Sequence, residues 1–209
     1  MSDVIFVDVD TQVDFLDPNG ALYVPGSREL TPILGRLTHL ARCRGIPILA
    51  TACAHTLDEL DPEPFPPHCL IGRPGAQRVA ATQWDLNDSL ARVVEPGGAF
   101  PTPPDHVRWW THLTIQKNRY DVFTQPAADQ AVADLRRRFG QPRFVVYGVA
   151  TDYCVRCAVA GLLQRGVPVE IVIDAVRAVF ADHEAEVLSD LIAQGAVLIL
   201  SDHLFMCFD

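Results

Sequence analysis

Short apolar runs recur along the chain and alternate with segments of helical period. The runs span residues 1–9, 46–52, 113–115, 144–148, 169–173 and 196–200. Each is nearly continuous in apolar residues, which is typical of strands covered on both faces. Helical patterns cover residues 27–44, 126–139, 154–165 and 182–194. Pro126 opens one of these helices, and Gly166 and Gly195 follow the ends of two others. The alternation predicts an α/β fold with six strands in a mainly parallel sheet.

Residues 56–112 interrupt this alternation. Nine of the 16 prolines lie between Pro62 and Pro104, so long helices are not expected there. A long irregular segment in a compact domain usually forms a lid or a wall of a site. The chain has 209 residues, a length that suits one domain. We therefore expect a single domain over residues 1–209 with an irregular, proline-rich insertion.

Composition and charge exclude several classes of function. The chain is 49% hydrophobic and 21% charged, as in ordinary globular proteins, and its formal net charge is -9. An acidic chain is a poor partner for nucleic acid or for anionic membranes. No apolar run reaches the ~18 residues of a membrane span, and acidic residues interrupt the first apolar stretch. These features predict a soluble, cytoplasmic protein that acts on a small molecule.

Reactive side chains directly follow four of the predicted strands. They are Asp10, Cys53 with His55, Lys117, and Cys154. Ligands of open parallel sheets bind beyond the carboxyl ends of the strands, so these residues should meet at one edge. Because we expect no secretory leader, the six cysteines point to metal binding or catalysis rather than to disulfides.

Cys154, Lys117 and Asp10 together suit nucleophilic catalysis. Cys154 is predicted at a helix start, where free N–H groups favour a thiolate, and Lys117 would lower the pKa of the thiol further. Lys117 is also the only lysine among 17 basic residues. Asp10 could take the thiol proton and pass it to a leaving amine. Each residue alone has a simpler interpretation: a turn or cap aspartate, a solvated lysine and an inert buried thiol.

Four separated motifs resemble the isochorismatase-like cysteine hydrolases, and among them the nicotinamidases. Residues 10–15 are similar to the D-x-Q-x-D-F opening of that family, and residues 117–123 to its K-x-x-Y-D-x-F segment. Residues 148–155 resemble the G-V-A-T-D-x-C-V nucleophile turn, and residues 174–179 the strand that follows it. The resemblance implies a three-layer α/β/α fold of the isochorismatase-like hydrolase type and a homo-oligomer.

The same resemblance implies roles for individual residues. Cys154 would be the nucleophile, Asp10 the general acid/base and Lys117 their electrostatic partner. A cis peptide between Val149 and Ala150 would place the N–H groups of Ala150 and Cys154 as an oxyanion hole, which stabilises a tetrahedral intermediate.

A candidate metal site follows the second predicted strand. Cys53-Ala54-His55 and Pro67-His68-Cys69 resemble the nicotinamidase motifs D-x-H and P-x-H-C, except that Cys53 stands where the family has aspartate. One cysteine and two histidines, His55 and His68, suit a divalent metal, and the thiolate favours zinc. Asp61 or Glu63 could complete the shell. Alternatively, Cys53 is a small buried residue and the histidines are merely hydrogen-bonded.

These residues predict a cysteine-dependent amidohydrolase that converts nicotinamide and water to nicotinate and ammonia. Phe15, Tyr120 and one of the tryptophans could wall an aromatic substrate pocket. Another small amide or a ureido compound is an alternative substrate. The Cys-x-x-Cys spacing of Cys154 and Cys157 also allows a thiol-disulfide oxidoreductase, and a catalytically silent binding protein is a third possibility.

Overall fold

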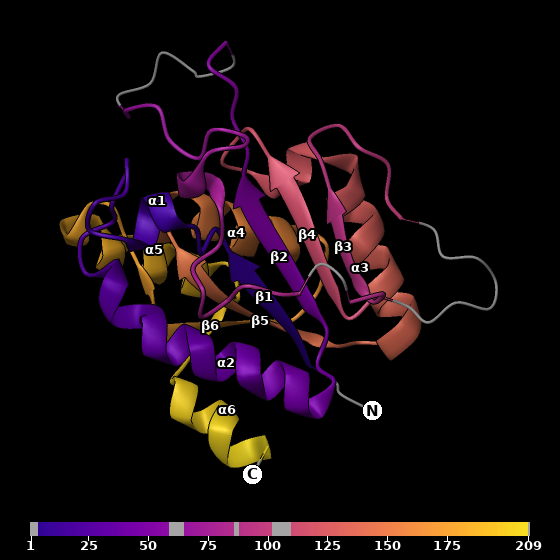
Figure 1. Ribbon diagram of the computed structural model, residues 1–209. Coiled ribbons are helices and arrows are strands. Elements are labelled where there is room, and N and C mark those ends of the chain that lie inside the picture. Colours follow the sequence, from indigo (N-terminus) through magenta and orange to yellow (C-terminus); the bar gives the residue numbers. More distant parts are fainter. Residues whose placement is uncertain (1–3, 59–64, 86–87, 102–109, 209) are drawn as a thin grey trace.

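A seven-stranded parallel sheet forms the centre of the protein in the computed structural model, which describes residues 4–58, 65–85, 88–101 and 110–208. The strands are β1 (Val4–Val9), β2 (Ile48–Cys53), β3 (Ala91–Val94), β4 (His112–Lys117), β5 (Arg143–Val149), β6 (Val169–Arg177) and β7 (Val197–Ile199). Their order is β3-β4-β2-β1-β5-β6-β7, and every neighbouring pair is parallel. All carboxyl ends therefore lie at one edge, at the top of Figure 1.

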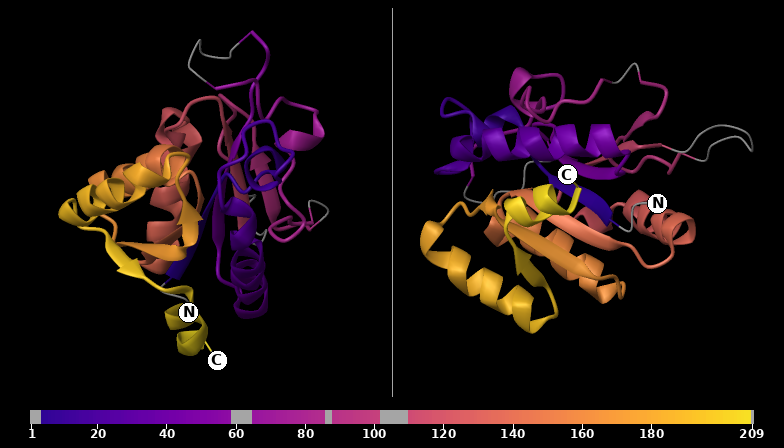
Figure 2. Two further views of the ribbon diagram at one scale, coloured as in Figure 1. Left: turned by 90° about the vertical axis from the view of Figure 1, so that its left-hand side faces the viewer. Right: turned by 90° about the horizontal axis from the view of Figure 1, so that it is seen from below.

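Helices cover both faces of the sheet. They are α1 (Val13–Leu16), α2 (Thr31–Arg44), α3 (Pro126–Phe139), α4 (Arg156–Gln164), α5 (Ala181–Ala193) and α6 (Ser201–Phe208). Figure 2 shows α2 on one face and α3, α4 and α5 on the other, while α6 lies beside α2 at the opposite end from the carboxyl edge. The three layers agree with the predicted α/β class. β1 and β2 are buried at all of their positions, which explains their unbroken apolar runs.

The sheet has seven strands, so the prediction of six was wrong. The additional strand is β3, which pairs with β4 at the edge of the sheet and lies inside the segment predicted to be irregular. β3 is only four residues long, and only Ala91 and Val94 of these are buried. Such a short, half-exposed strand among prolines leaves no periodicity that could be recognised in the sequence.

Two predicted helices also begin differently from expectation. The pattern at residues 27–44 is a 3-10 turn, η1 (Ser27–Leu30), followed by α2. The pattern at residues 154–165 is preceded by a π-helical turn, η4 (Thr151–Val155), which continues into α4. Cys154 therefore lies in the π turn and not at the first position of a regular helix. π turns of this kind occur frequently at functional sites.

Gly148 sets the distance between β5 and β1 just before this turn. Its φ is 116°, and a Cβ at this position would collide with the backbone of Val9. Any side chain would push the two strands apart. The absence of a side chain at Gly148 lets η4 lie close to Asp10, which follows Val9.

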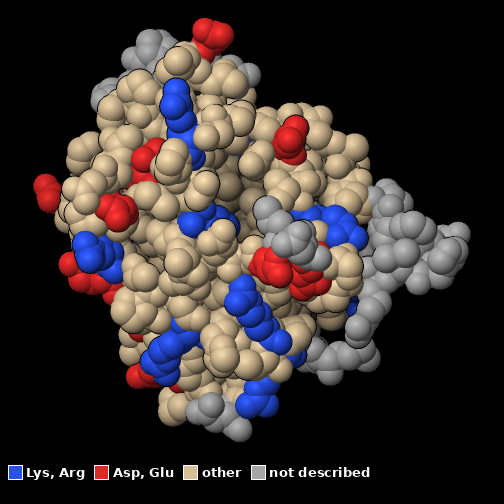
Figure 3. Space-filling model, in the orientation of Figure 1, with Lys and Arg blue, Asp and Glu red and all other residues tan. Residues whose placement is uncertain are grey.

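Charged side chains of both signs are scattered over the face of the molecule that Figure 3 shows, without a continuous basic area on that face. Among the helices of the described residues, none combines the length and apolar character needed to cross a bilayer.

Candidate active site

Four side chains from four strand ends meet at the carboxyl edge of the sheet. Asp10 follows β1, Cys53 is the last residue of β2, and Lys117 is the last residue of β4. Cys53 and Lys117 are register partners in the β2–β4 pair. Cys154 lies in η4, just beyond β5. The convergence predicted from the sequence is therefore present, because parallel strands bring their ends together.

The Lys117 ammonium is at the centre of the cluster. Its Nζ donates to Asp10 Oδ2 at 2.8 Å, to Cys53 Sγ at 3.2 Å and to Cys154 Sγ at 3.3 Å. Lys117 and Asp10 are both almost completely buried. Buried charges require partners of opposite sign, and here one ammonium faces a carboxylate and two thiols. The interpretation of Lys117 as a solvated strand-end charge is therefore wrong.

Two neighbours orient this cluster. Thr51 Oγ1 donates to Asp10 Oδ1 at 2.6 Å. The Gln12 side chain accepts from Cys53 N at 2.7 Å and donates to the carbonyls of Cys53 and Ala76, both at 2.8 Å. Gln12 thus links the end of β2 to the segment around Ala76 through hydrogen bonds. Sequence reasoning assigned no role to Thr51 or Gln12.

The environment of Asp10 and Lys117 shifts both pKa values upward. Burial is the largest cause that raises the pKa of Asp10, the charge of Cys53 adds to it, and Lys117 opposes both. Burial alone would lower the pKa of Lys117, but attraction to Asp10 and to the two thiols outweighs it, so that pKa is well above its ordinary value. Lys117 therefore remains a cation, and Asp10 is the group that can exchange a proton.

The two thiols have opposite shifts. The hydrogen bond with Cys154 is the largest of the causes that lower the pKa of Cys53 well below its usual range. The same contact is the largest cause that raises the pKa of Cys154 well above its usual range. Lys117 does lower the pKa of Cys154, as predicted, but the contact with Cys53 and burial of the thiol outweigh it. Sequence reasoning missed this competition, since it placed Cys53 only in a metal site.

Cys53 also forms a second cluster with His55 and His68. One ligand atom from each residue lies within 4.8 Å of the other two. His55 is buried, and neither of its ring nitrogens has a hydrogen-bond partner among the described residues. Both histidine rings nevertheless lie close enough to Cys53 to lower the pKa of its thiol. His68 Nδ1 lies 2.9 Å from the Pro66 carbonyl, an arrangement that leaves Nε2 for another ligand.

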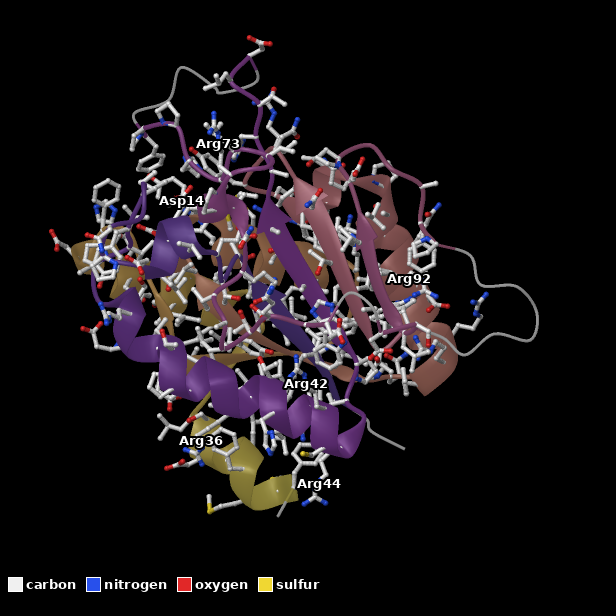
Figure 4. All side chains as sticks on the ribbon, viewed as in Figure 1. Asp14, Arg36, Arg42, Arg44, Arg73 and Arg92 are labelled. Carbon is white, nitrogen blue, oxygen red and sulfur yellow. The ribbon has the colours of Figure 1, made fainter. Side chains whose placement is uncertain are left out.

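Asp14 holds the chain segment that carries His68. This residue is labelled in Figure 4, where it lies at α1 beside the loops above the sheet. Asp14 Oδ2 accepts from Cys69 N at 2.6 Å, and its other oxygen accepts from Ala21 N at 3.1 Å. A side chain at Gly75 would collide with the same carboxylate, so the loop after Cys69 also packs closely on Asp14. The predicted additional ligands Asp61 and Glu63 lie outside the described residues.

A cavity of about 80 Å³ opens above both clusters. Asp10, Cys53, Cys154, His55 and His68 contribute to its lining. The aromatic walls include both residues that the sequence suggested, and two that it did not. These side chains are Phe15, Tyr120, Phe65 and Tyr153. No tryptophan of the described residues lines the cavity, so that part of the expectation is not supported.

The turn between β5 and α4 forms another part of the wall. Val149 and Ala150 line the cavity together with Cys154, and the peptide bond between Val149 and Ala150 is cis, as the resemblance implied. Cys157 is half-buried on α4, whereas the thiol that approaches Cys154 is Cys53. The thiol partner of Cys154 in the structure is therefore Cys53, which is remote in sequence, and not Cys157.

The fold and this site define an α/β protein whose candidate active site combines a thiol, a carboxylate and an ammonium at the carboxyl edge of a parallel sheet. The isochorismatase domain matches residues 4–203, so the chain belongs to the isochorismatase family.

Individual relatives support the same assignment. The chain is 27% identical over 211 residues to the nicotinamidase of Escherichia coli, with 91% of each chain covered. Its fold is similar to that of the Pyrococcus horikoshii pyrazinamidase in complex with zinc, with a TM-score of 0.71, 24% identity, and 95% and 99% of the two chains covered. The Thermoplasma acidophilum N-carbamoylsarcosine amidase gives a TM-score of 0.72 at 20% identity, covering 97% and 98%.

Proposed function

We propose that this protein is a cysteine-dependent amidohydrolase of the nicotinamidase type, which converts nicotinamide and water to nicotinate and ammonia. One observation carries the proposal: the Lys117 ammonium contacts both the Asp10 carboxylate and the Cys154 thiol beside an aromatic-walled cavity. Family membership and the similarity to nicotinamidases support it.

Cys154 is the proposed nucleophile, and Asp10 the proposed general acid/base. Asp10 takes the Cys154 proton as Sγ attacks the carboxamide carbon, and then delivers that proton to the departing ammonia. Water next attacks the thioester, Asp10 accepts its proton, and the acid leaves as the thiol is restored. The upward shift in the pKa of Asp10 supports this role, because a carboxyl group that exchanges protons near neutrality needs a raised pKa.

Lys117 and two backbone N–H groups are proposed to stabilise charge during these steps. Lys117 compensates the negative charge that Asp10 and Cys154 share. The N–H groups of Ala150 and Cys154 form the proposed oxyanion hole, where two fixed donors stabilise the tetrahedral oxyanion by several kcal/mol. Phe15 and Tyr120 are the proposed aromatic walls for the substrate ring.

Cys53, His55 and His68 are the proposed ligands of a zinc ion. Their ligand atoms are close together, and the unpartnered ring nitrogens of buried His55 fit this assignment. When bound, zinc would compensate the Cys53 thiolate and supply a Lewis-acid position for a substrate nitrogen or a water molecule.

Hydrolysis of another small amide or of a ureido compound is the second candidate. Asn118 and Arg119 line the cavity beside the aromatic residues, so a substrate with additional polar groups could bind there. The similarity in fold to an N-carbamoylsarcosine amidase is compatible with this alternative. A homo-oligomeric state and a cytoplasmic location remain predictions, which light scattering and cell fractionation would check.

A substrate panel tests the proposal. Ammonia release is measured with nicotinamide, pyrazinamide and N-carbamoylsarcosine, using protein with measured zinc content. Turnover of nicotinamide at a rate typical of enzymes, above about 1 per second, supports the proposed substrate. Turnover of N-carbamoylsarcosine alone would favour the second candidate, whereas no release from any amide would reject the amidohydrolase proposal.

A further inference from the structure

Cys53 and Cys154 form a close thiol pair, although 101 positions of sequence separate them (154 - 53). Their sulfur atoms lie within 4.8 Å of each other, and Lys117 Nζ donates to both. The two thiols come from separate elements, β2 and η4, which approach each other at the carboxyl edge of the sheet. The amide chemistry proposed above needs only one of these sulfurs as a nucleophile.

Both sulfurs can be reached from the same cavity. Cys53 and Cys154 line its wall, and each retains a small exposed fraction, 5% and 7%. A molecule as small as hydrogen peroxide could therefore reach them along the path that a substrate would take. Lys117 Nζ donates to both sulfurs, so the two thiols are held at the same end of the cavity.

We propose that Cys53 and Cys154 are a reversible oxidation site, in which a hydroperoxide converts the thiol pair into a Cys53–Cys154 disulfide. The thiolate of one cysteine of the pair attacks the peroxide, forming an S–O bond as the O–O bond breaks, and the alkoxide or hydroxide that leaves takes up a proton. The thiol of the other cysteine then attacks the sulfenic sulfur and displaces water. Two thiols are oxidised by two electrons, and the hydroperoxide is reduced to an alcohol or to water.

The disulfide would require the two sulfurs, which lie within 4.8 Å of each other, to approach to about 2.05 Å. Its formation would block the nucleophile without destroying it, because a thiol reductant restores both cysteines. A Cys154 that lacks a nearby thiol would instead advance to sulfinic acid, which thiols do not reduce. The structure thus gives Cys53 a protective role that does not depend on amidase activity.

Peptide mapping of the full chain tests this proposal. The exposed Cys43 and Cys207 are first replaced by serine to prevent cross-links between molecules. The metal-free protein, in which Cys53 is not a zinc ligand, is exposed to hydrogen peroxide, alkylated and digested with trypsin without reduction. Trypsin separates Cys154, on residues 144–156, from Cys157, and leaves Cys53 with Cys69 on residues 45–78, because Arg73 precedes proline.

The expected product is a cross-link between peptides 45–78 and 144–156 that disappears on treatment with dithiothreitol. It should persist in the matched Cys69→Ser and Cys157→Ser variants and be absent from Cys53→Ser, in which Cys154 gains two oxygen atoms instead. A cross-link to Cys157 or Cys69, or the same irreversible oxidation of Cys154 with and without Cys53, would overturn the proposal. The peptide map and the amidase assay are separate readouts, so the oxidation proposal and the amidohydrolase proposal can fail independently.

Discussion

Cys53 and Cys154 accept hydrogen bonds from the same ammonium, Lys117 Nζ, at 3.2 and 3.3 Å. The two thiols therefore compete for one compensating charge. Their interaction lowers the pKa of Cys53 and raises that of Cys154. Cys53, which stands where the sequence comparison led us to expect aspartate, is thus part of the candidate active site as well as a candidate metal ligand.

Removing this competitor should make Cys154 more reactive. In Cys53→Ala, the largest cause that raises the pKa of Cys154 is absent, whereas Lys117 still lowers it. The pKa of Cys154 should fall, and alkylation by iodoacetamide near pH 7 should accelerate by about tenfold for each unit of the shift. Alkylation is followed by mass spectrometry on metal-free protein, with Cys157→Ala as the matched control. An unchanged pH profile of Cys154 alkylation would contradict the competition.

Lys117 should be essential for catalysis. Lys117→Met removes the ammonium that contacts Asp10 and both thiols, and should lower kcat by about 10² to 10³-fold, as loss of a preorganised charge does in other enzymes. Lys117→Arg should not restore activity, because the position is buried and a guanidinium group is larger. Steady-state kinetics with matched circular dichroism spectra separate loss of catalysis from loss of folding. Full activity in Lys117→Arg would argue against a compact, buried cation.

Zinc binding should depend on His55 and His68 but not on an exposed histidine. His55→Ala and His68→Ala each remove one of the proposed ligands, so the zinc content should fall from about one per chain to a small fraction. His183→Ala is the control, since His183 is exposed on α5. Metal analysis after dialysis measures the zinc content of each variant and does not depend on an activity assay. Equal zinc content in all three variants would exclude this site.

His112 should contribute to the loss of stability in acid. It is buried and stacked on Trp84, with ring centroids 4.8 Å apart, and burial lowers its pKa to about 3. As the pH falls from about 6.5 to about 3, the unfolded chain binds a proton that the folded chain does not, so stability falls by up to about 5 kcal/mol.

The variant His112→Phe retains an aromatic ring beside Trp84 and cannot be protonated. Its free energy of unfolding should therefore change less between pH 7 and pH 4 than that of the wild type. Urea unfolding at a series of pH values measures this difference. Parallel pH profiles for the two proteins would show that His112 is not a source of the acid sensitivity.

Much of the architecture follows from the pattern of the sequence, and the exceptions have physical causes. Long apolar runs such as β1 and β2 are recognisable because both faces are buried. β3 is short, half-exposed and surrounded by prolines, so its pattern carries no comparable signal. The proline-rich segment nevertheless contributes Phe65 and His68 to the cavity, as expected for a site wall.

In the candidate site, too, some contacts follow from the sequence pattern and others do not. The positions of Asp10, Lys117 and Cys154 at strand ends follow from parallel topology, which sequence periodicity reveals. The proximity of Cys53 to Cys154 does not follow from the topology, since β1 lies between β2 and β5 and the contact depends on the path of the η4 turn after β5. The contact between Thr51 and Asp10 could have been predicted from the sequence. Thr51 lies two residues before Cys53 on the same strand, so its side chain can face the residue after β1.

Ammonia release from nicotinamide by the wild type and by Cys154→Ala tests the assignment of Cys154 as the nucleophile. We expect measurable turnover in the wild type and a rate at background in the variant, a loss of at least about 10³-fold. Cys207→Ala, which alters an exposed thiol, should retain wild-type turnover. Turnover in Cys154→Ala within about tenfold of the wild type would contradict the assignment of Cys154 as the nucleophile.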